Sequence, residues 1–532
     1  MSRLKRKSSN FLQSLIATMG ISQILSACGG SGGSNNLVPS LLPQLNDQSN
    51  TNYVNVPGSS AAESLVAEGN NNTRITAGSG DDLIQTFAGN DLIYGDAGND
   101  TILSGAGNDE IYGGDGNDSI KPGDGDDTID AGPGDDNIEL SAGNDFEDGG
   151  DGIDTLVISA ASLSIPFTIN LQTGRYFLTP QSNSQTPNFA NIENITSYSS
   201  VNLTISDTIG VNEITLSSGD DTVTSIGGND IINTGGGNDT VTLGLGSYTV
   251  DLGSGDDILN LGSQQSKING GSGTDTVVVS SETGLNTVHI DLSNDFYFTT
   301  DVGPSFDGQD ISLKDFENVT ILGGISSTIT GGSDANTILG GSAVDNIKGR
   351  SGDDIIFAGD GDDIIDGGAG SDNLTGGGGD DTFVFTKSSN GADTINDFVI
   401  ADDILQFADS ADLSLVGVSN LNFVIGEQTT LKDGIDLIDA THNIIVLTNE
   451  IANVGAAVKD IAGTSNKIGD GVIVIAAATV DNDPNITAEY AKIWYDATSA
   501  VDAESDTVLL ATLNGITLSD LNSFTVDNFT IT

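Results

Sequence analysis

The sequence predicts an all-β protein, most of which is a parallel β-roll or β-helix solenoid of nonapeptide repeats, with a β-rich C-terminal domain. Three observations predict this fold class. Glycine and aspartate recur together every nine residues over long stretches, and an apolar residue stands two positions after most of these aspartates. The 532-residue chain also has 70 glycines and only 5% aromatic residues. Stacked short units are therefore favoured over a conventional globular core.

The charge balance of the chain points to cations as partners. There are 16 Lys and Arg residues against 76 Asp and Glu residues, a formal net charge of -60 at pH 7. A compact state without counterions would repel itself, and nucleic acid is not expected as a partner. Composition alone leaves open an acidic disordered chain or a halophile-type surface. A fixed period of carboxylates argues against both.

The first array of repeats is expected over residues 77–157. In units numbered so that glycine is fourth, nine consecutive units have glycine there, from Gly80 to Gly152, and aspartate at the sixth position. The eighth position is apolar except at Glu147. Glycine permits the positive φ of a tight turn, and the apolar residue supplies one inward side chain per short strand. Two units make one coil of the solenoid, so residues eighteen apart stack about 4.8 Å from each other.

The second array, residues 210–278, has two edges of different chemistry. Its apolar eighth positions are unbroken, but the sixth positions separate into two sets when sorted by eighteen residues. One edge keeps its aspartates throughout, whereas the other edge reads Asn212, Asp230, Tyr248 and Ser266. We therefore expect this array to bind cations on one edge only.

The third array, residues 325–385, acquires its aspartates late. Its opening units have Ser327 and Asn336 at the sixth position and are expected to be free of calcium. Carboxylates together with backbone carbonyls are hard oxygen ligands that suit Ca²⁺, which tolerates six to eight oxygens in irregular geometry. With one ion between each pair of aspartates eighteen residues apart, the chain would bind about 13 ions. The predicted metal ligands are Asp82, Asp91, Asp100, Asp109, Asp118, Asp127, Asp136, Asp145, Asp154, Asp221, Asp239, Asp257, Asp275, Asp345, Asp354, Asp363, Asp372 and Asp381.

Two inserts, residues 158–209 and 279–324, separate the arrays and resemble each other. Ile192-Glu193-Asn194 in the first corresponds to Phe316-Glu317-Asn318 in the second. The alternating segments 167–171 and 288–292 read as longer strands that extend the solenoid. His289 has no nearby histidine or cysteine, so a metal or catalytic role is not favoured.

The nonapeptides resemble the RTX, or haemolysin-type, calcium-binding repeat family, whose pattern is G-G-x-G-x-D-x-U-x. The following region, residues 386–532, resembles the segment that caps the roll in serralysin-like and haemolysin-like proteins. Asp393-Thr394-Ile395-Asn396-Asp397-Phe398 is similar to the cap, and 493–496 with 507–515 is similar to a final hairpin. Residues 524–532 resemble an uncleaved type I secretion signal. The resemblance implies calcium as the cofactor and an extracellular destination.

The N-terminus has the pattern of a bacterial lipoprotein signal over residues 1–28. Four basic residues precede a moderately apolar run that ends in Leu25-Ser26-Ala27-Cys28-Gly29. Cys28, the only cysteine of the chain, would be the lipidation site and a link to the outer membrane. A fortuitous cysteine in a disordered N-terminus remains the alternative. Residues 29–76, rich in Gly, Ser and Asn, are expected to be a flexible tether.

These features predict an extracellular or cell-surface protein of a Gram-negative bacterium, with its export route open. An enzyme is not expected, since His289 and His442 are the only histidines and no His-Glu-x-x-His zinc motif exists. A calcium-stabilised surface-layer (S-layer) or adhesion component is favoured, with self-association or surface glycans as partners. The alternative is a secreted RTX enzyme or toxin-like effector whose activity lies in the inserts or the C-terminal region. Residues 433–459 are compatible with a helix, because residues 451–461 are partly amphipathic.

Overall fold

The computed structural model of the chain describes most of the repeats and parts of the C-terminal region. Cys28 and residues 29–52 lie outside the described residues, as does most of the stretch 408–489. Two compact units are present, residues 1–219 and 220–532, and each is described by itself. The described residues are 53–67, 69–159, 166–178, 188–262, 266–280, 287–299, 311–385, 392–407, 423–426, 444–451, 472–478, 490–496, 507–514, 516, 520–524 and 528–531.

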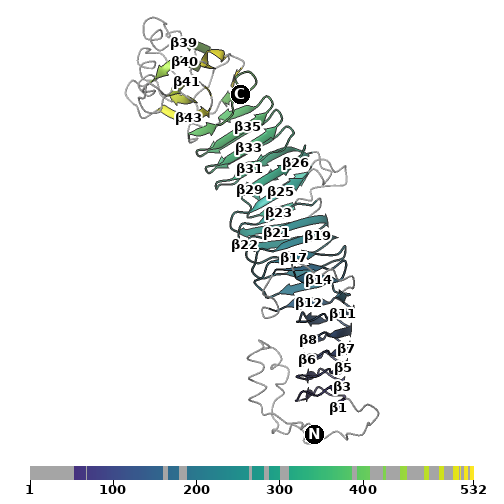
Figure 1. Ribbon diagram of the computed structural model, residues 1–532. Helices are drawn as coiled ribbons and strands as arrows, with labels where there is room; N and C mark the ends of the chain where they lie inside the picture. The colour runs from purple at the N-terminus through teal and green to yellow at the C-terminus, as the bar shows by residue number, and fades with distance from the viewer. Residues whose placement is uncertain are drawn as a thin grey trace, which may run out of the picture. The chain divides into compact units, whose positions relative to one another are not determined.

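Unit 1 is a parallel β-solenoid in which the chain passes alternately through two sheets (Figure 1). Within the repeats, neighbouring strands of one sheet pair at a register of eighteen residues, as Ile93 does with Ile111. One sheet contains β1 (Val54–Ser59), β3 (Thr73–Ser79), β5 (Leu92–Ala97), β7 (Glu110–Asp115), β9 (Thr128–Pro133), β11 (Phe146–Asp151) and β15 (Phe189–Ala190). The other contains β2 (Ser64–Val66), β4 (Leu83–Gln85), β6 (Thr101–Ala106), β8 (Ser119–Asp124), β10 (Asn137–Glu139), β12 (Thr155–Ile158), β16 (Asn194–Ser197) and β18 (Glu213–Thr215).

The core of unit 1 is the column of eighth-position side chains. Ile84, Ile93, Ile102 and Ile111 are fully buried. Each strand contributes one such side chain, which stacks on its counterpart eighteen residues away. Burial of this column removes apolar surface from water in every coil and stabilises the solenoid without a conventional core.

The solenoid begins earlier than the repeats, so the predicted tether of residues 29–76 is wrong over its described part. β1 pairs with β3 and places Val56 beside Ile75, and β2 pairs with β4. Val56 is buried. The backbone ladder and one inward apolar residue are enough for a coil, whereas a search at nine residues detects only coils with glycine and aspartate at fixed positions.

The first insert extends the solenoid, as predicted for segment 167–171. β13 (Phe167–Asn170) pairs in parallel with β17 (Leu203–Ser206), and it also forms an antiparallel hairpin with β14 (Arg175–Leu178). β15 and β16 then return the chain to the two sheets of the first array.

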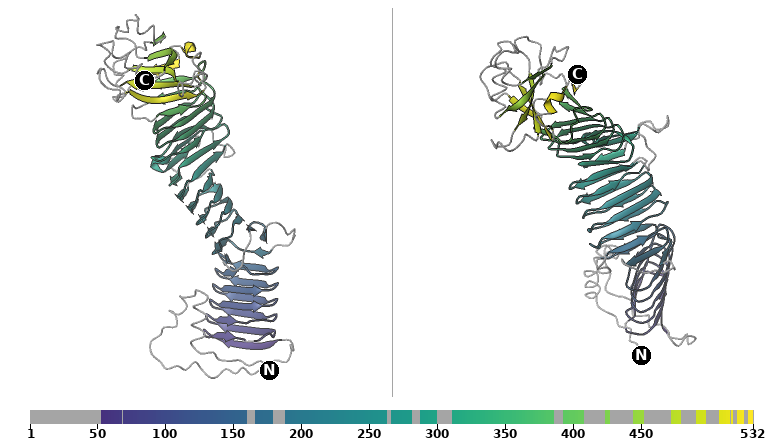
Figure 2. Two further views of the ribbon diagram at one scale, coloured as in Figure 1. Left: turned by 60° about the vertical axis from the view of Figure 1, so that its left-hand side comes forward. Right: turned by 45° about the horizontal axis from the view of Figure 1, so that its top comes forward.

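Unit 2 repeats the architecture of two sheets over the second and third arrays (Figure 2). Its second insert also extends the solenoid as predicted, because β26 (Thr287–Asp291) pairs in parallel with β30 (Ser326–Thr330) and forms a hairpin with β27 (Phe296–Thr299). One sheet contains β20 (Ile231–Asn233), β22 (Thr249–Ser254), β24 (Lys267–Ser272), β26 (Thr287–Asp291), β27 (Phe296–Thr299), β28 (Ile311–Lys314), β30 (Ser326–Thr330), β32 (Asn346–Ser351), β34 (Ile364–Ala369), β36 (Thr382–Phe385) and β38 (Ile404–Phe407). The other contains β19 (Thr222–Gly228), β21 (Thr240–Gly246), β23 (Ile258–Asn260), β25 (Thr276–Ser280), β29 (Asn318–Leu322), β31 (Thr337–Leu339), β33 (Ile355–Asp360), β35 (Asn373–Gly378) and β37 (Asp393–Ile395).

The C-terminal region caps both sheets of unit 2. β42 (Tyr490–Asp496) and β43 (Thr507–Asn514) form the predicted hairpin, and β43 pairs in parallel with β37. β44 (Phe529–Ile531), within the segment that resembles a secretion signal, pairs with β38. β39 (Phe423–Gly426), β40 (Ile444–Ile451) and β41 (Val472–Ala478) complete the sheet that contains β37, β42 and β43. Within the segment 433–459, where a helix is expected, the described residues 444–451 instead form strand β40, whose Ile-Ile-Val-Leu run favours a strand; the rest of that segment lies outside the described residues.

Within the described residues, none of the helical segments is long and apolar enough to cross a membrane.

Candidate calcium-binding ladders

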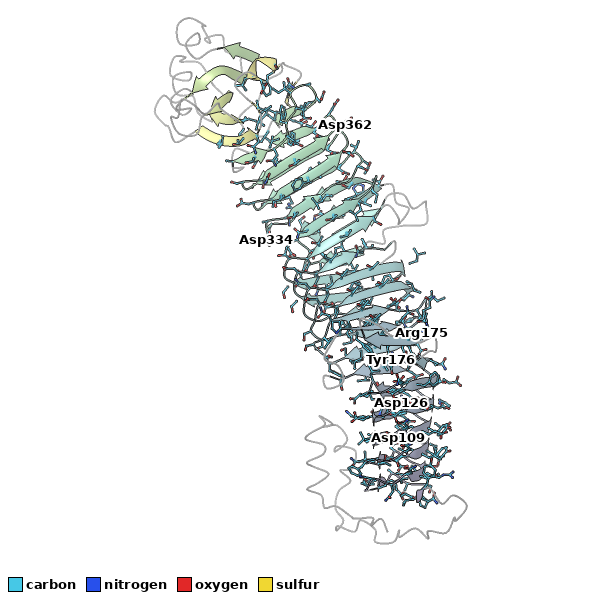
Figure 3. The ribbon with its side chains drawn as sticks, viewed as in Figure 1. Asp109, Asp126, Arg175, Tyr176, Asp334 and Asp362 are labelled. Carbon is cyan, nitrogen blue, oxygen red and sulfur yellow. The ribbon has the colours of Figure 1, made fainter. Side chains whose placement is uncertain are left out.

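The predicted ligands lie at the sheet edges, directly before the short strands. Figure 3 shows Asp109 and Asp126 among the side chains that follow one another along unit 1. All eighteen predicted ligands are buried, with at most 3% of each residue's surface exposed. Aspartate is rarely buried to this extent unless its charge is compensated.

One oxygen of each carboxylate is used to join successive coils. In unit 1 the backbone N–H of Asp82 donates to Asp100 Oδ1 (2.8 Å), and the N–H of Asp100 donates to Asp118 Oδ1 (2.7 Å). The other edge repeats this pattern from Asp91 to Asp145. The sixth-position aspartates therefore form a hydrogen-bonded ladder along each edge.

The second carboxylate oxygen is left without a donor at most of these positions. In fourteen of the eighteen predicted ligands, Oδ2 is buried and has no hydrogen-bond partner in the described structure. Burial raises the pKa of Asp100, Asp118 and Asp127 to about 7. A buried anionic oxygen is costly unless a proton or a cation neutralises it. These oxygens therefore fit a cation that binds between coils.

Backbone carbonyls gather near the same oxygens. A Cβ built on Gly95 would lie closer than 3.0 Å to both Asp100 Oδ2 and the carbonyl oxygen of Gly113. A Cβ on Gly116 would similarly meet the carbonyl of Gly98 in the preceding coil. Carboxylate and carbonyl oxygens are the ligand types that Ca²⁺ prefers. When bound, calcium would neutralise the carboxylates and cross-link successive coils.

No cluster of three or more His, Cys, Asp or Glu side chains that could hold a metal is found among the described residues. His289, on β26, accordingly lies in no such cluster. Each predicted calcium site instead combines aspartates from successive coils with main-chain oxygens, so side-chain clustering alone does not reveal it.

The glycine at the fourth position of each repeat is sterically restricted. Gly116 has φ 130°, and a Cβ there would clash with the Gly98 backbone. We expect Gly116→Ala to destabilise the calcium-loaded protein by about 1–3 kcal/mol, through backbone strain and overpacking. Thermal melting in calcium would measure this. Gly324→Ala is the control, because the nearest atom to its Cβ is Ser342 Oγ at 3.7 Å. Equal melting temperatures for the two variants would contradict the expectation.

A second ladder runs outside the first and was not predicted. The N–H of Asn99 donates to Asp81 Oδ1 (2.9 Å), and the N–H of Asn117 donates to Asn99 Oδ1 (2.9 Å). These fifth-position side chains are exposed and connect the coils in the opposite direction to the sixth-position carboxylates. The recurrence of Asn or Asp at the fifth position was visible in the sequence and could have identified this ladder.

The aspartate edge of the second array has the same geometry as the first array. The N–H of Asp221 donates to Asp239 Oδ1 and that of Asp239 to Asp257 Oδ1, both at 2.7 Å. The N–H of Asp257 donates to Asp275 Oδ1 at 2.9 Å. The predicted calcium ligands of this edge are therefore brought together in one continuous row.

The opposite edge of the second array is filled by protein groups. Tyr248 is 3% exposed, and its hydroxyl lies 3.3 Å from Ser225 Oγ. Ser225 Oγ donates to Asp230 Oδ2 (2.8 Å), the oxygen that has no donor at most other aspartates. The N–H of Tyr248 donates to Ser266 Oγ. Protein groups therefore occupy the edge where no calcium is expected. Calcium binding on the aspartate edge alone stays a prediction.

The ladder of the third array continues beyond its predicted end. The N–H of Asp372 donates to Asp393 Oδ1 (3.1 Å), and that of Asp381 donates to Asp403 Oδ1 (3.0 Å). Sequence reasoning missed Asp393 and Asp403 because they follow at 21 and 22 residues instead of eighteen. In the opening units, the N–H groups of Ser327 and Asn336 donate to Asp345 and Asp354.

Glu147, the one interruption of the apolar column in the first array, is fully buried and meets the first insert. The Tyr176 hydroxyl donates to Glu147 Oε1 (3.2 Å). Desolvation, followed by the charge of Asp145, raises the pKa of Glu147 to about 8. Tyr176 packs against Phe167 and Phe189, with ring centroids 5.4 and 6.1 Å away. The buried Glu147 carboxyl group therefore joins the first array to the first insert through Tyr176.

We expect Tyr176→Phe to destabilise unit 1 by about 1–3 kcal/mol, because Glu147 loses its donor inside the core. Urea unfolding of the calcium-loaded protein would measure this. Tyr198→Phe is the matched control, since Tyr198 is 65% exposed. Adding Glu147→Leu to Tyr176→Phe should recover much of the loss. A double variant less stable than the single variant would contradict this role of the pair.

Comparison with known proteins agrees with the geometry. A family profile described as the RTX calcium-binding nonapeptide repeat matches residues 69–102, 86–120, 94–129, 122–156, 208–250, 251–281, 323–356 and 348–383. A search of curated proteins found no match. The matched ranges contain all the predicted aspartate ligands, and the β-solenoid places these aspartates in rows at its edges. The three repeat arrays of this chain therefore belong to the family of RTX calcium-binding nonapeptide repeats.

Proposed function

We propose that this protein is exported and that calcium outside the cell completes its folding. The observation that carries the proposal is the row of buried carboxylate oxygens without donors, on a chain of net charge -60. Calcium bound to these oxygens would lower the free energy of the folded state relative to the unfolded chain. Cytosolic calcium is too low to fill such sites, so folding would follow export.

The role that we propose is structural: a calcium-stabilised surface-layer or adhesion component, not an enzyme. The repeats and the coils continuous with them form most of the described residues, and their recurrent chemistry is cation binding. The solenoid of each unit also offers extended strand faces for a second copy of the chain or for surface glycans.

Attachment to the outer membrane through lipidated Cys28 is part of the proposal, whereas the C-terminal segment supports one-step type I export. The intact mass of protein released from the cell surface distinguishes the routes. A mature start at a lipidated Cys28 supports the anchor, and an uncleaved Met1 supports type I export.

The structural role is tested by adding and removing calcium. Purified protein should assemble into sheets or bind cells in calcium, and a chelator should release it from the cell surface. Turnover of a lipid, glycan or peptide panel by calcium-loaded protein, without assembly or adhesion, would overturn the structural role and favour an enzyme.

A further inference from the structure

Both inserts rejoin the solenoid through an unusually short turn. Ala190 pairs with Asp148 and Asn194 with Thr155, so residues 191–193 span the edge that the glycine turn 149–154 spans in the preceding coil. In unit 2, Lys314 pairs with Asn269 and Asn318 with Thr276. Residues 315–317 there replace the turn 270–275. We call residues 191–193 and 315–317 the glutamate turns.

The two glutamate turns close the coil in the same way. Asn191 and Asp315 adopt the left-handed conformation, with φ 50° and 55°. Ile192 and Phe316 are buried, at 4% and 6% exposure. The third residue of each turn is a glutamate, which directly precedes the next strand. This is the place of the sixth-position aspartate in a full nonapeptide.

Each glutamate accepts the hydrogen bond that an aspartate accepts elsewhere in the ladder. The N–H of Asp154 donates to Glu193 Oε2 (2.9 Å), and the N–H of Asp275 donates to Glu317 Oε2 (2.7 Å). The longer side chain reaches the N–H although the turn is three residues shorter. The carboxylate row therefore continues past the last aspartate of the first and second arrays.

The oxygens around each glutamate turn match those of a regular coil. Asp154 and Asp275 are fully buried, and Oδ2 of each has no hydrogen-bond partner in the described structure. A Cβ on Gly149 would lie closer than 3.0 Å to Asp154 Oδ2 and the carbonyl of Asn191. A Cβ on Gly270 would likewise meet Asp275 Oδ2 and the carbonyl of Asp315. Gly95 has the same relation to Asp100 and Gly113.

On the side of each glutamate that faces the next coil, an asparagine side-chain amide donates a hydrogen bond to the glutamate's backbone carbonyl. Asn212 Nδ2 donates to the carbonyl oxygen of Glu193, and Asn336 Nδ2 donates to that of Glu317 (2.6 Å). An amide donor there takes the place of a further carboxylate and needs no cation. Each glutamate therefore has a neighbouring aspartate with an unpaired Oδ2 in the preceding coil, and an asparagine amide in the following coil.

We propose that Asp154 with Glu193, and Asp275 with Glu317, each bind one additional Ca²⁺ ion at the end of a repeat array. These two sites lie outside the nonapeptide pattern. The proposal rests on calcium binding by the repeats and adds one site at each array end. It also assigns the glutamate turns the function of terminating the calcium rows next to the inserts.

Native mass spectrometry of the full-length protein in calcium tests the two sites. Glu193→Gln with Glu317→Gln should bind two fewer ions than the wild type, because glutamine still accepts the N–H but carries no charge. Glu213→Gln, an exposed glutamate on β18, is the control and should keep the wild-type count. An unchanged count in the double variant overturns the two sites. A wild type that binds no calcium would instead overturn the proposed function.

Circular dichroism at two calcium concentrations covers the case in which the double variant loses strand structure. If the loss reflects weakened ion binding, a tenfold increase in calcium should restore the strand signal. A loss that calcium does not restore would show that the glutamates act only through their hydrogen bonds, and it would also overturn the proposal.

Discussion

Removing calcium at pH 8 is expected to abolish most of the β-strand circular dichroism signal of the full-length protein. Without cations the buried aspartates are ionised, and the net charge of -60 favours an expanded chain. The unpaired Oδ2 atoms add a desolvation cost in almost every coil of the repeats. Calcium offsets both terms, so folding and calcium binding should occur in one coupled transition.

The measurement is a calcium titration of chelated protein followed by far-ultraviolet circular dichroism. An equal concentration of magnesium is the control, and it should restore much less strand signal because Mg²⁺ requires six near-ideal octahedral ligands. A stoichiometry of one to three calcium ions per chain would contradict the ladder, for which the aspartate pairs predict about 13 ions. Full strand signal in the chelator would contradict calcium-coupled folding.

Acidification is expected to replace calcium in part. Burial raises the pKa of Asp100, Asp118, Asp127 and Asp354 to about 7, from an ordinary value of 3.8. Between these values the folded state binds more protons than the unfolded chain, so the stability of the calcium-free roll rises as the pH falls from about 7 towards 4. Above pH 7 this stabilisation is lost, and calcium is then required.

Protein freed of calcium by desalting should therefore gain strand signal on transfer from pH 8 to pH 5. Protons and calcium compete for the same carboxylates, so the folded protein should bind calcium more tightly at pH 8 than at pH 5. The variant Asp118→Asn is compared with the wild type in both measurements. It should bind calcium more weakly, and it should gain less strand signal on acidification because it has one titrating carboxyl fewer. Strand signal that decreases steadily on acidification would contradict the assignment of raised pKa values to these buried aspartates.

The repeat arrays were predictable because the residues that specify each turn and strand lie within a single nonapeptide. Glycine at the fourth position, aspartate at the sixth and an apolar residue at the eighth specify a turn and a short strand locally. Coils of identical length then stack in register, and the structure accordingly buries Asp100 and Asp118 in one row. The longer strands of the inserts were also predictable, from the alternation of apolar residues over segments 167–171 and 288–292.

Coils and ladder residues that depart from the nine-residue spacing could not be predicted from the sequence. Val54–Ser59 and Ser64–Val66 form coils without the glycine and aspartate signature, because pairing with the next coil supplies their register. Asp393 and Asp403 join the ladder although the chain between them and their partners is longer than a nonapeptide pair. In these cases the position of a side chain depends on where its strand docks, not on its distance along the chain.

The sequence by itself determined the solenoid, its three arrays and the eighteen aspartates at the sixth position, since a strict local repeat leaves few other ways to bury an apolar residue every nine positions. Only the tertiary structure decided that Glu193 and Glu317 continue the carboxylate rows and that Asn212 and Asn336 close them. It also decided that Tyr248 fills one edge with Ser225. These roles arise between coils, where strand pairing brings together residues whose spacing in sequence carries no signal.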